Sequence, residues 1–122
     1  MKRIIYRIFD RYFRKKAIKN HRKMWRWLAD NPTKDKLNYL VPLSGRELPL
    51  NSCYLCDYAI RAAGREGFAH RFMCQYCPLD WDGQECNEEY LSLFDKWVFE
   101  TNLQKRSELA LRIAELPERK VK

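Results

Sequence analysis

Five cysteines carry most of the chemistry that this chain of 122 residues offers. Cys53 and Cys56 form one C-x2-C pair, Cys74 and Cys77 form a second pair seventeen residues later, and Cys86 follows. Two residues between thiols let one tight turn direct both sulfurs at a single ion, and two such turns complete a tetrahedron. The spacing therefore predicts a Zn²⁺ ion bound by four thiolates.

The sequence does not determine the fourth zinc ligand, because Cys86 is close enough to replace Cys74 and His70 is a third candidate. A complete thiolate shell leaves no position for water, so we expect this zinc to be structural. Two alternatives compete with zinc. In one, the thiols pack as small hydrophobic side chains. In the other, one pair serves redox chemistry, although the strand–helix alternation of thioredoxin-like proteins is missing.

Catalytic motifs are not recognisable. A zinc deaminase would place a Glu motif upstream of Pro-Cys-x-x-Cys, and neither cysteine pair follows a proline. Of the two histidines, His21 lies in a basic segment, where we expect a solvated side chain rather than a general base. The sequence shows no Ser–His–Asp set and no glycine-rich phosphate loop, so we expect a protein that is not an enzyme.

The net charge of +8 is concentrated at the N-terminus. Residues 1–30, the basic arm, contain eleven Lys and Arg against two Asp, while residues 78–100 contain seven acids and one base. Such asymmetry favours an acidic partner or attraction between the two ends of the chain. Seven cations of the arm are candidate contacts for nucleic acid or a partner protein: Arg11, Arg14, Lys15, Lys16, Arg22, Lys23 and Arg26.

Four aromatic residues interleave with these cations: Tyr12, Phe13, Trp25 and Trp27. One interpretation is a phosphate-binding face with side chains that stack on bases. A second is an acidic protein partner, and a third, which we regard as weaker, is an amphipathic helix on an anionic membrane. The simplest is that the aromatic residues pack against a C-terminal helix while the cations face solvent.

Apolar residues recur at helical spacing from Ile4 to Ala29, and Pro32 closes the pattern. The spacing fits one long helix or two helices broken near 19–21. Residues 31–52 contain three prolines and a glycine, which predicts a connector with little regular structure.

Residues 53–86 form the expected zinc module, with a helical stretch after Ser52 and a loop or short β-hairpin over 67–76. Residues 87–117 predict a long C-terminal helix that is capped by Asn87 and ended by Pro117. We therefore predict a mainly helical single domain over 1–122, with the N- and C-terminal helices packed together and the zinc knuckles at one end.

No run of 18 apolar residues is present, and the N-terminus lacks the pattern of a secretory signal. We therefore expect a protein of the cytoplasm, where thiols stay reduced and zinc accounts better for paired cysteines than disulfides do.

Several motifs occur in order: "AIKNHRKMWRWLAD", "CYLCDYA", "CQYCPLDW", the further Cys86, "YLSLFDKW" and "LALRIAELPER". In this series the chain resembles a family of small phage and prophage proteins, over Ala17 to Arg119. Among such proteins it resembles the anti-CRISPR proteins of type II systems. That resemblance implies a non-enzymatic inhibitor in the bacterial host cytoplasm, which binds the RNA-guided nuclease and blocks nucleic-acid loading. The alternative is a basic, zinc-containing phage regulator that binds nucleic acid.

Overall fold

The computed structural model describes residues 2–43, 53–65, 77–81 and 92–119 of the chain. The described part is mainly helical, as the sequence predicts. Its helices are α1 (Lys2–Asp30), α2 (Lys36–Leu40), α3 (Tyr54–Arg65), α4 (Leu93–Phe99) and α5 (Leu103–Ala114). The extended backbone around Leu79 and Glu118 meets in an isolated antiparallel bridge.

The N-terminal segment forms one continuous helix, α1, of 29 residues. Of the two arrangements that the apolar spacing allowed, the single helix is therefore present, without a break near 19–21. The helix ends where the Asn31 side-chain amide donates to the carbonyl oxygen of Trp27 at 2.8 Å. Pro32, which disfavours helical geometry in the residue before it, then follows.

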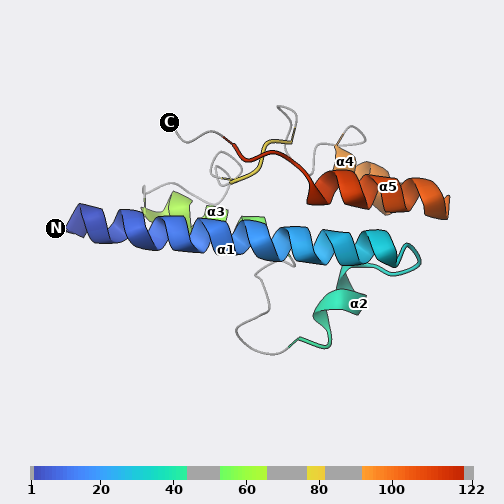
Figure 1. The fold of residues 1–122 in the computed structure, drawn as a ribbon, viewed down its shortest axis with the longest axis horizontal. Coiled ribbons are helices and arrows are strands. Elements are labelled where there is room, and N and C mark those ends of the chain that lie inside the picture. Colours follow the sequence, from blue (N-terminus) through green and yellow to red (C-terminus); the bar gives the residue numbers. More distant parts are fainter. Residues whose placement is uncertain (1, 44–52, 66–76, 82–91, 120–122) are drawn as a thin grey trace.

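Helix α1 forms the long axis of the molecule, and the other helices pack along it (Figure 1). Helices α4 and α5 lie beside its C-terminal half, and α3 lies beside its N-terminal half. The short helix α2 lies on the side of α1 opposite to α5 in this view. A single long helix is therefore the scaffold on which the described part of the chain assembles.

The main core forms where α1 meets α4 and α5. Trp25 is 2 % exposed, and its ring lies 4.8 Å from that of Trp97 in an edge-to-face arrangement. Met24 and Leu28 of α1 and Ile113 of α5 are also buried there. Large buried aromatic rings contribute much of the apolar area that stabilises so small a core.

The predicted connector contains more structure than its prolines indicated. Helix α2 begins after Asp35, whose carboxylate accepts from the backbone N–H of Asn38 at 3.2 Å. The Asn38 side chain in turn accepts from the Asp35 N–H at 2.9 Å, which completes a capping box. In the described part of the predicted connector 31–52, this cap begins a helix of five residues, and Leu40 of that helix packs in the core.

The C-terminal segment is also different from its prediction. The described part of 87–117 contains two helices, α4 and α5, where one was expected. Each helix has its own cap, because Ser92 accepts from the Asp95 N–H and Asn102 accepts from the Lys105 N–H. Between them the chain is extended, so α4 and α5 pack on each other, and the Trp97 ring of α4 reaches Trp25 of α1.

Backbone hydrogen bonds join the segment after the second cysteine pair to the C-terminal tail. The N–H of Asp80 donates to Pro117 and the N–H of Arg119 donates to Pro78, both at 2.8 Å. The predicted hairpin over 67–76 and the predicted caps Ser52 and Asn87 lie outside the described residues.

Candidate functional site

Six cations on the exposed face of α1 form the most distinctive surface of the described structure. No ion pair or side-chain hydrogen bond ties any of them to another described residue. We call this set the basic stripe: Arg11, Lys15, Lys16, Lys19, Lys23 and Arg26.

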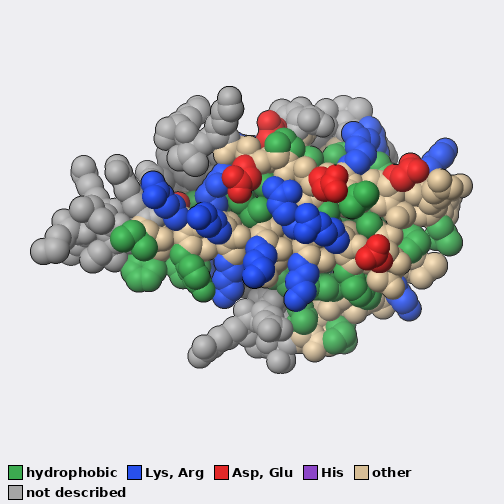
Figure 2. All heavy atoms as spheres, viewed as in Figure 1, with side chains coloured by type: hydrophobic (Ala, Val, Ile, Leu, Met, Phe, Trp, Pro, Cys, Tyr) green, Lys and Arg blue, Asp and Glu red, His purple; other side chains and the backbone are tan. Residues whose placement is uncertain are grey.

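Helical geometry places the six side chains within about 140° of the circumference of α1 and along about 22 Å of its length. No acidic residue interrupts the segment between Asp10 and Asp30. Figure 2 shows the basic side chains gathered over α1 across the middle of the view, with most acidic side chains above them or near the end of the helix. The result is a continuous band of positive charge that faces solvent.

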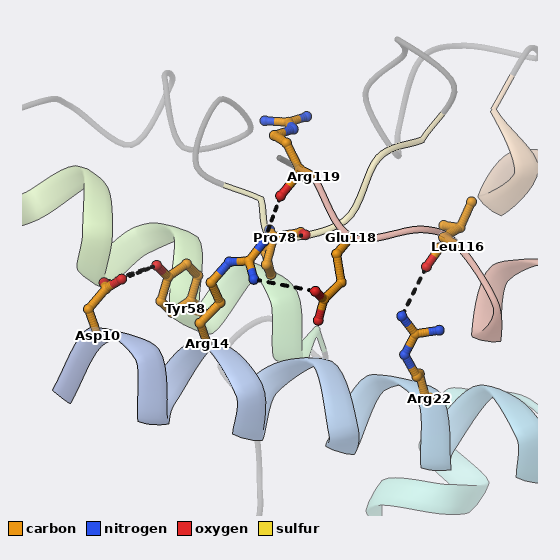
Figure 3. Close-up of polar contacts among 8 residues, drawn as sticks. All are labelled: Asp10, Arg14, Arg22, Tyr58, Pro78, Leu116, Glu118 and Arg119. Atoms are coloured by element: carbon orange, nitrogen blue, oxygen red, sulfur yellow. Dashed lines mark hydrogen bonds and ion pairs between the residues drawn. The ribbon is translucent and has the colours of Figure 1, made fainter. Parts of the chain in front are cut away.

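Arg14, one of the predicted contact residues, turns toward the interior instead. Its guanidinium donates to the carbonyl oxygen of Arg119 at 2.8 Å and to that of Pro78 at 3.2 Å (Figure 3). Its Nη1 also lies 3.8 Å from a carboxylate oxygen of Glu118, and the Arg14 side chain is only 16 % exposed. Arg14 thus links the C-terminal tail and the segment at Pro78 to α1 through two hydrogen bonds and an ion pair.

Arg22 has a similar internal role at the end of α5. Its guanidinium donates to the carbonyl oxygen of Ala114 at 3.1 Å. It also donates to that of Leu116 at 3.2 Å (Figure 3). Carbonyl groups at the C-terminus of a helix lack partners within the helix, and Arg22 supplies a donor to that of Ala114. Arg14 and Arg22 therefore stabilise the fold, whereas the other five predicted cations remain exposed.

The aromatic residues of α1 divide between core and surface. Trp25 is buried against Trp97, and Trp27 packs on Tyr39 with 5.4 Å between ring centroids. The predicted stacking role is therefore wrong for Trp25, which packs against the C-terminal helices as the simplest interpretation expected. Tyr12 is 57 % exposed and remains available to a ligand.

The first cysteine pair lies at the start of α3. Cys53 precedes the helix, and its sulfur accepts from the backbone N–H of Cys56 at 3.2 Å. Hydrogen bonding from the Cys56 side chain is the main cause that lowers the pKa of Cys53 to about 6. The opposing effect is burial, since Cys53 packs against the main core. These two thiols therefore lie within one turn of the chain.

Cys77 also packs against the main core, at the end of the second cysteine pair. Cys74, Cys86 and His70 lie outside the described residues. Within the described part, no three His, Cys, Asp or Glu side chains lie together as a group that could hold a metal ion. The zinc site and its fourth ligand therefore stay predictions.

Comparison with known protein families, curated proteins and solved structures finds no match. Among the helices in the described part of the chain, none has the length and apolar character needed to cross a membrane.

His21 corrects a prediction. It is 2 % exposed rather than solvated, and its Nε2 lies 2.9 Å from the carbonyl oxygen of Ile113. Burial is the main cause that lowers the pKa of His21 to about 4, and the nearby charges of Lys36 and Arg22 act in the same direction. A neutral, buried imidazole joins α1 to α5, and it has no access to a substrate in solvent.

One exposed cation of the stripe, Lys19, was absent from the predicted contact residues. Its position in the sequence could have indicated this role, because Arg11, Lys15, Lys19 and Lys23 follow one another at intervals of four residues. Residues at this interval share one face of a helix. Counting positions along the helix, rather than counting charge in the segment, would have included Lys19 and set aside Arg14.

Proposed function

We propose that this protein is a non-enzymatic nucleic-acid-binding protein, whose basic stripe on α1 contacts the phosphate backbone. The observation that carries the proposal is the row of six exposed cations on one face of a continuous helix, none of them paired within the described residues. Phosphates of nucleic acids are spaced regularly and carry one negative charge each, so they match an extended band of Lys and Arg.

When no ligand is bound, repulsion between the like charges of the basic stripe destabilises α1. Arg11 and Lys15, Lys15 and Lys19, and Lys19 and Lys23 are like-charged pairs at i,i+4 spacing. Each such pair destabilises an isolated helix by about 0.2–0.5 kcal/mol. A surface whose only role is solubility usually mixes both signs of charge. A polyanion relieves this repulsion and releases counterions on binding, which supports a phosphate ligand.

Fluorescence anisotropy with labelled DNA at low salt tests the proposal. The triple variant Lys15→Gln, Lys19→Gln, Lys23→Gln removes three charges from one face of α1. We expect its affinity for DNA to fall about tenfold or more, because each phosphate contact contributes to the electrostatic part of binding.

The matched control is Lys96→Gln, Lys105→Gln, Arg112→Gln, which removes the same charge from exposed positions on α4 and α5. Equal losses in the two variants would mean that net charge, and no particular surface, attracts DNA. No binding by the wild-type protein would overturn the proposed function itself.

The cysteines support a second element of the proposal, a structural zinc ion. Cys53 and Cys56 lie in one turn at the start of α3, and Cys77 lies against the same core. Zinc would supply folding free energy to a small domain, and thiolates of paired C-x2-C motifs are its usual ligands. Zinc per chain in the purified protein is the test, together with Cys74→Ser and Cys86→Ser.

We expect one equivalent of zinc in the wild-type protein, lost in one of the two variants. Zinc lost only in Cys74→Ser would establish the two pairs as the ligand set. Zinc lost only in Cys86→Ser would establish the alternative set. Unchanged zinc content and thermal stability in Cys56→Ser would contradict the site.

A second candidate function is the one implied by the resemblance to phage proteins, inhibition of a type II RNA-guided nuclease by direct binding. The structural observation that favours a protein partner is exposed apolar surface at the junction of α4 and α5. Phe99 is 68 % exposed and Leu103 is 49 % exposed. Exposed apolar side chains close together in the chain are suited to a protein interface.

Size-exclusion chromatography with the nuclease tests this candidate. A complex that survives moderate salt and is lost in Phe99→Ser, Leu103→Ser would support it, since apolar contacts are insensitive to screening. A complex that instead dissociates with salt, and that depends on the basic stripe, would support binding to the guide RNA and not to the protein.

A further inference from the structure

An aromatic cluster lies at the N-terminal end of the basic stripe. Phe9 is 52 % exposed and Tyr12 is 57 % exposed, which is unusual for large aromatic side chains on a small protein. The two rings flank Phe13: the centroids of Phe9 and Phe13 lie 6.4 Å apart in a stacked arrangement, and those of Tyr12 and Phe13 lie 5.4 Å apart edge to face.

Packing against buried side chains fixes the position of the Phe13 ring. It packs against a small buried cluster formed by Ala17 of α1 and by Tyr58 and Ala62 of α3. The guanidinium of Arg61 lies 5.1 Å from the centroid of the Phe13 ring. The exposed rings of Phe9 and Tyr12 therefore contact a Phe13 ring whose position is fixed by its packing against α3.

The backbone beneath the cluster is fixed as well. The hydroxyl group of Tyr58 donates to both carboxylate oxygens of Asp10 at 2.9 Å, which ties this turn of α1 to α3 (Figure 3). Asp10 thereby directs its charge toward α3. A ligand at Phe9 and Tyr12 would meet preorganised rings, with little side-chain entropy lost on binding.

Charge decides which ligand suits this surface. Lys15 and Lys16 follow Tyr12 at spacings of three and four residues, which places them on the same face of α1, and both are exposed. Aromatic rings next to a row of cations match a nucleic-acid strand whose bases are unpaired, because bases stack on the rings while phosphates contact the cations. In a duplex the faces of the bases are covered by their neighbours, so only the phosphates remain available to α1.

We infer that Phe9 and Tyr12 form a base-stacking platform, which gives the basic stripe a preference for single-stranded over double-stranded nucleic acid. The inference rests on the proposed nucleic-acid binding and adds the class of ligand. Phosphate contacts along the stripe would serve both forms, and the platform would add affinity only where bases are free to stack.

The test compares three labelled probes by anisotropy: oligothymidylate, an abasic strand of equal length, and a duplex. The variant is Phe9→Ala, Tyr12→Ala, and Phe99→Ala is the control that removes an even more exposed ring elsewhere. We expect the variant to lose affinity for oligothymidylate by on the order of tenfold, with unchanged affinity for the abasic strand and the duplex. Phe99→Ala should bind all three probes as the wild-type protein does.

Several outcomes would overturn the inference. Unchanged binding of oligothymidylate by the double variant would show that no base stacks on these rings. Equal losses for all three probes would show that the substitutions disturb the stripe itself. Vesicles of anionic phospholipid serve as a fourth probe. If the double variant loses affinity for these vesicles but binds nucleic acid as the wild-type protein does, the rings belong to a membrane-binding surface. If the wild-type protein binds no probe, both the proposed function and the stacking platform are overturned.

Discussion

The imidazole Nε2 of His21 donates to the carbonyl oxygen of Ile113 across 2.9 Å, deep in the contact between α1 and α5. The direction follows from chemistry, because a carbonyl oxygen only accepts, so Nε2 carries the proton. The guanidinium groups of Arg14 and Arg22 likewise donate from α1 to backbone carbonyls of the C-terminal segment. Polar side chains of α1 thus satisfy the C-terminal backbone, and the basic stripe is left to solvent.

The buried imidazole makes stability depend on pH. Because the pKa of His21 is lowered to about 4, the unfolded chain, with an ordinary pKa near 6.5, binds more protons than the folded chain between these two values. The free energy of unfolding therefore falls as the pH falls through this window. The contribution of His21 is a loss of roughly 2 kcal/mol between pH 7 and pH 5.

Urea unfolding at several pH values, for the wild-type protein and His21→Gln, measures this contribution. Gln keeps a donor near the position of Nε2 and does not titrate, so the variant should show a flatter pH profile. Arg26→Gln, at an exposed position of the same helix, should keep the profile of the wild-type protein. Parallel profiles for wild-type and His21→Gln would contradict the assignment of the pH dependence to His21.

Two arginines of α1 should separate stability from binding. Arg22→Gln removes the donor to Ala114 and Leu116, which should lower the free energy of unfolding by about 1–3 kcal/mol. Arg26→Gln removes an exposed charge and should change stability by less than about 0.5 kcal/mol while weakening DNA binding. Denaturant unfolding and anisotropy on both variants check the pair. The reverse pattern would show that the two roles are assigned to the wrong residues.

The aromatic core should tolerate truncation poorly. Trp25→Ala removes a buried ring that lies 4.8 Å from Trp97 and should cost about 3–5 kcal/mol of stability. Trp25→Phe keeps part of the contact and should cost less. Tyr12→Ala, at an exposed position of the same helix, serves as the control and should leave the unfolding midpoint nearly unchanged. An unfolding midpoint that is equal in Trp25→Ala and the wild-type protein would contradict the role of this ring in the core.

The sequence predicts α1 well because its signals are local. Ala17, His21, Met24 and Leu28 share one helical face, and nothing interrupts the helix before Pro32. The same spacing would have predicted a buried His21, had the residue been judged by its position rather than by its charged neighbours.

The break between α4 and α5 was missed for a related reason. Apolar residues continue through the segment without Pro or Gly, and the only local signal is Asn102, a residue favoured at helix N-termini. The acceptors of Arg14 and Arg22 had no local signal. They are backbone carbonyls, 64 to 105 residues away in the chain, and carbonyls leave no trace in the residue types.

The salt dependence of DNA binding tests the central claim most directly. The slope of log K against log salt reports the number of phosphates neutralised, with about 0.7 per contact for single strands and about 0.9 for duplexes. For Lys15→Gln, Lys19→Gln, Lys23→Gln we expect the slope to become shallower by about 2 to 3 relative to wild type. The triple variant on α4 and α5 should keep the wild-type slope. An unchanged slope in the α1 variant would contradict phosphate binding by the basic stripe.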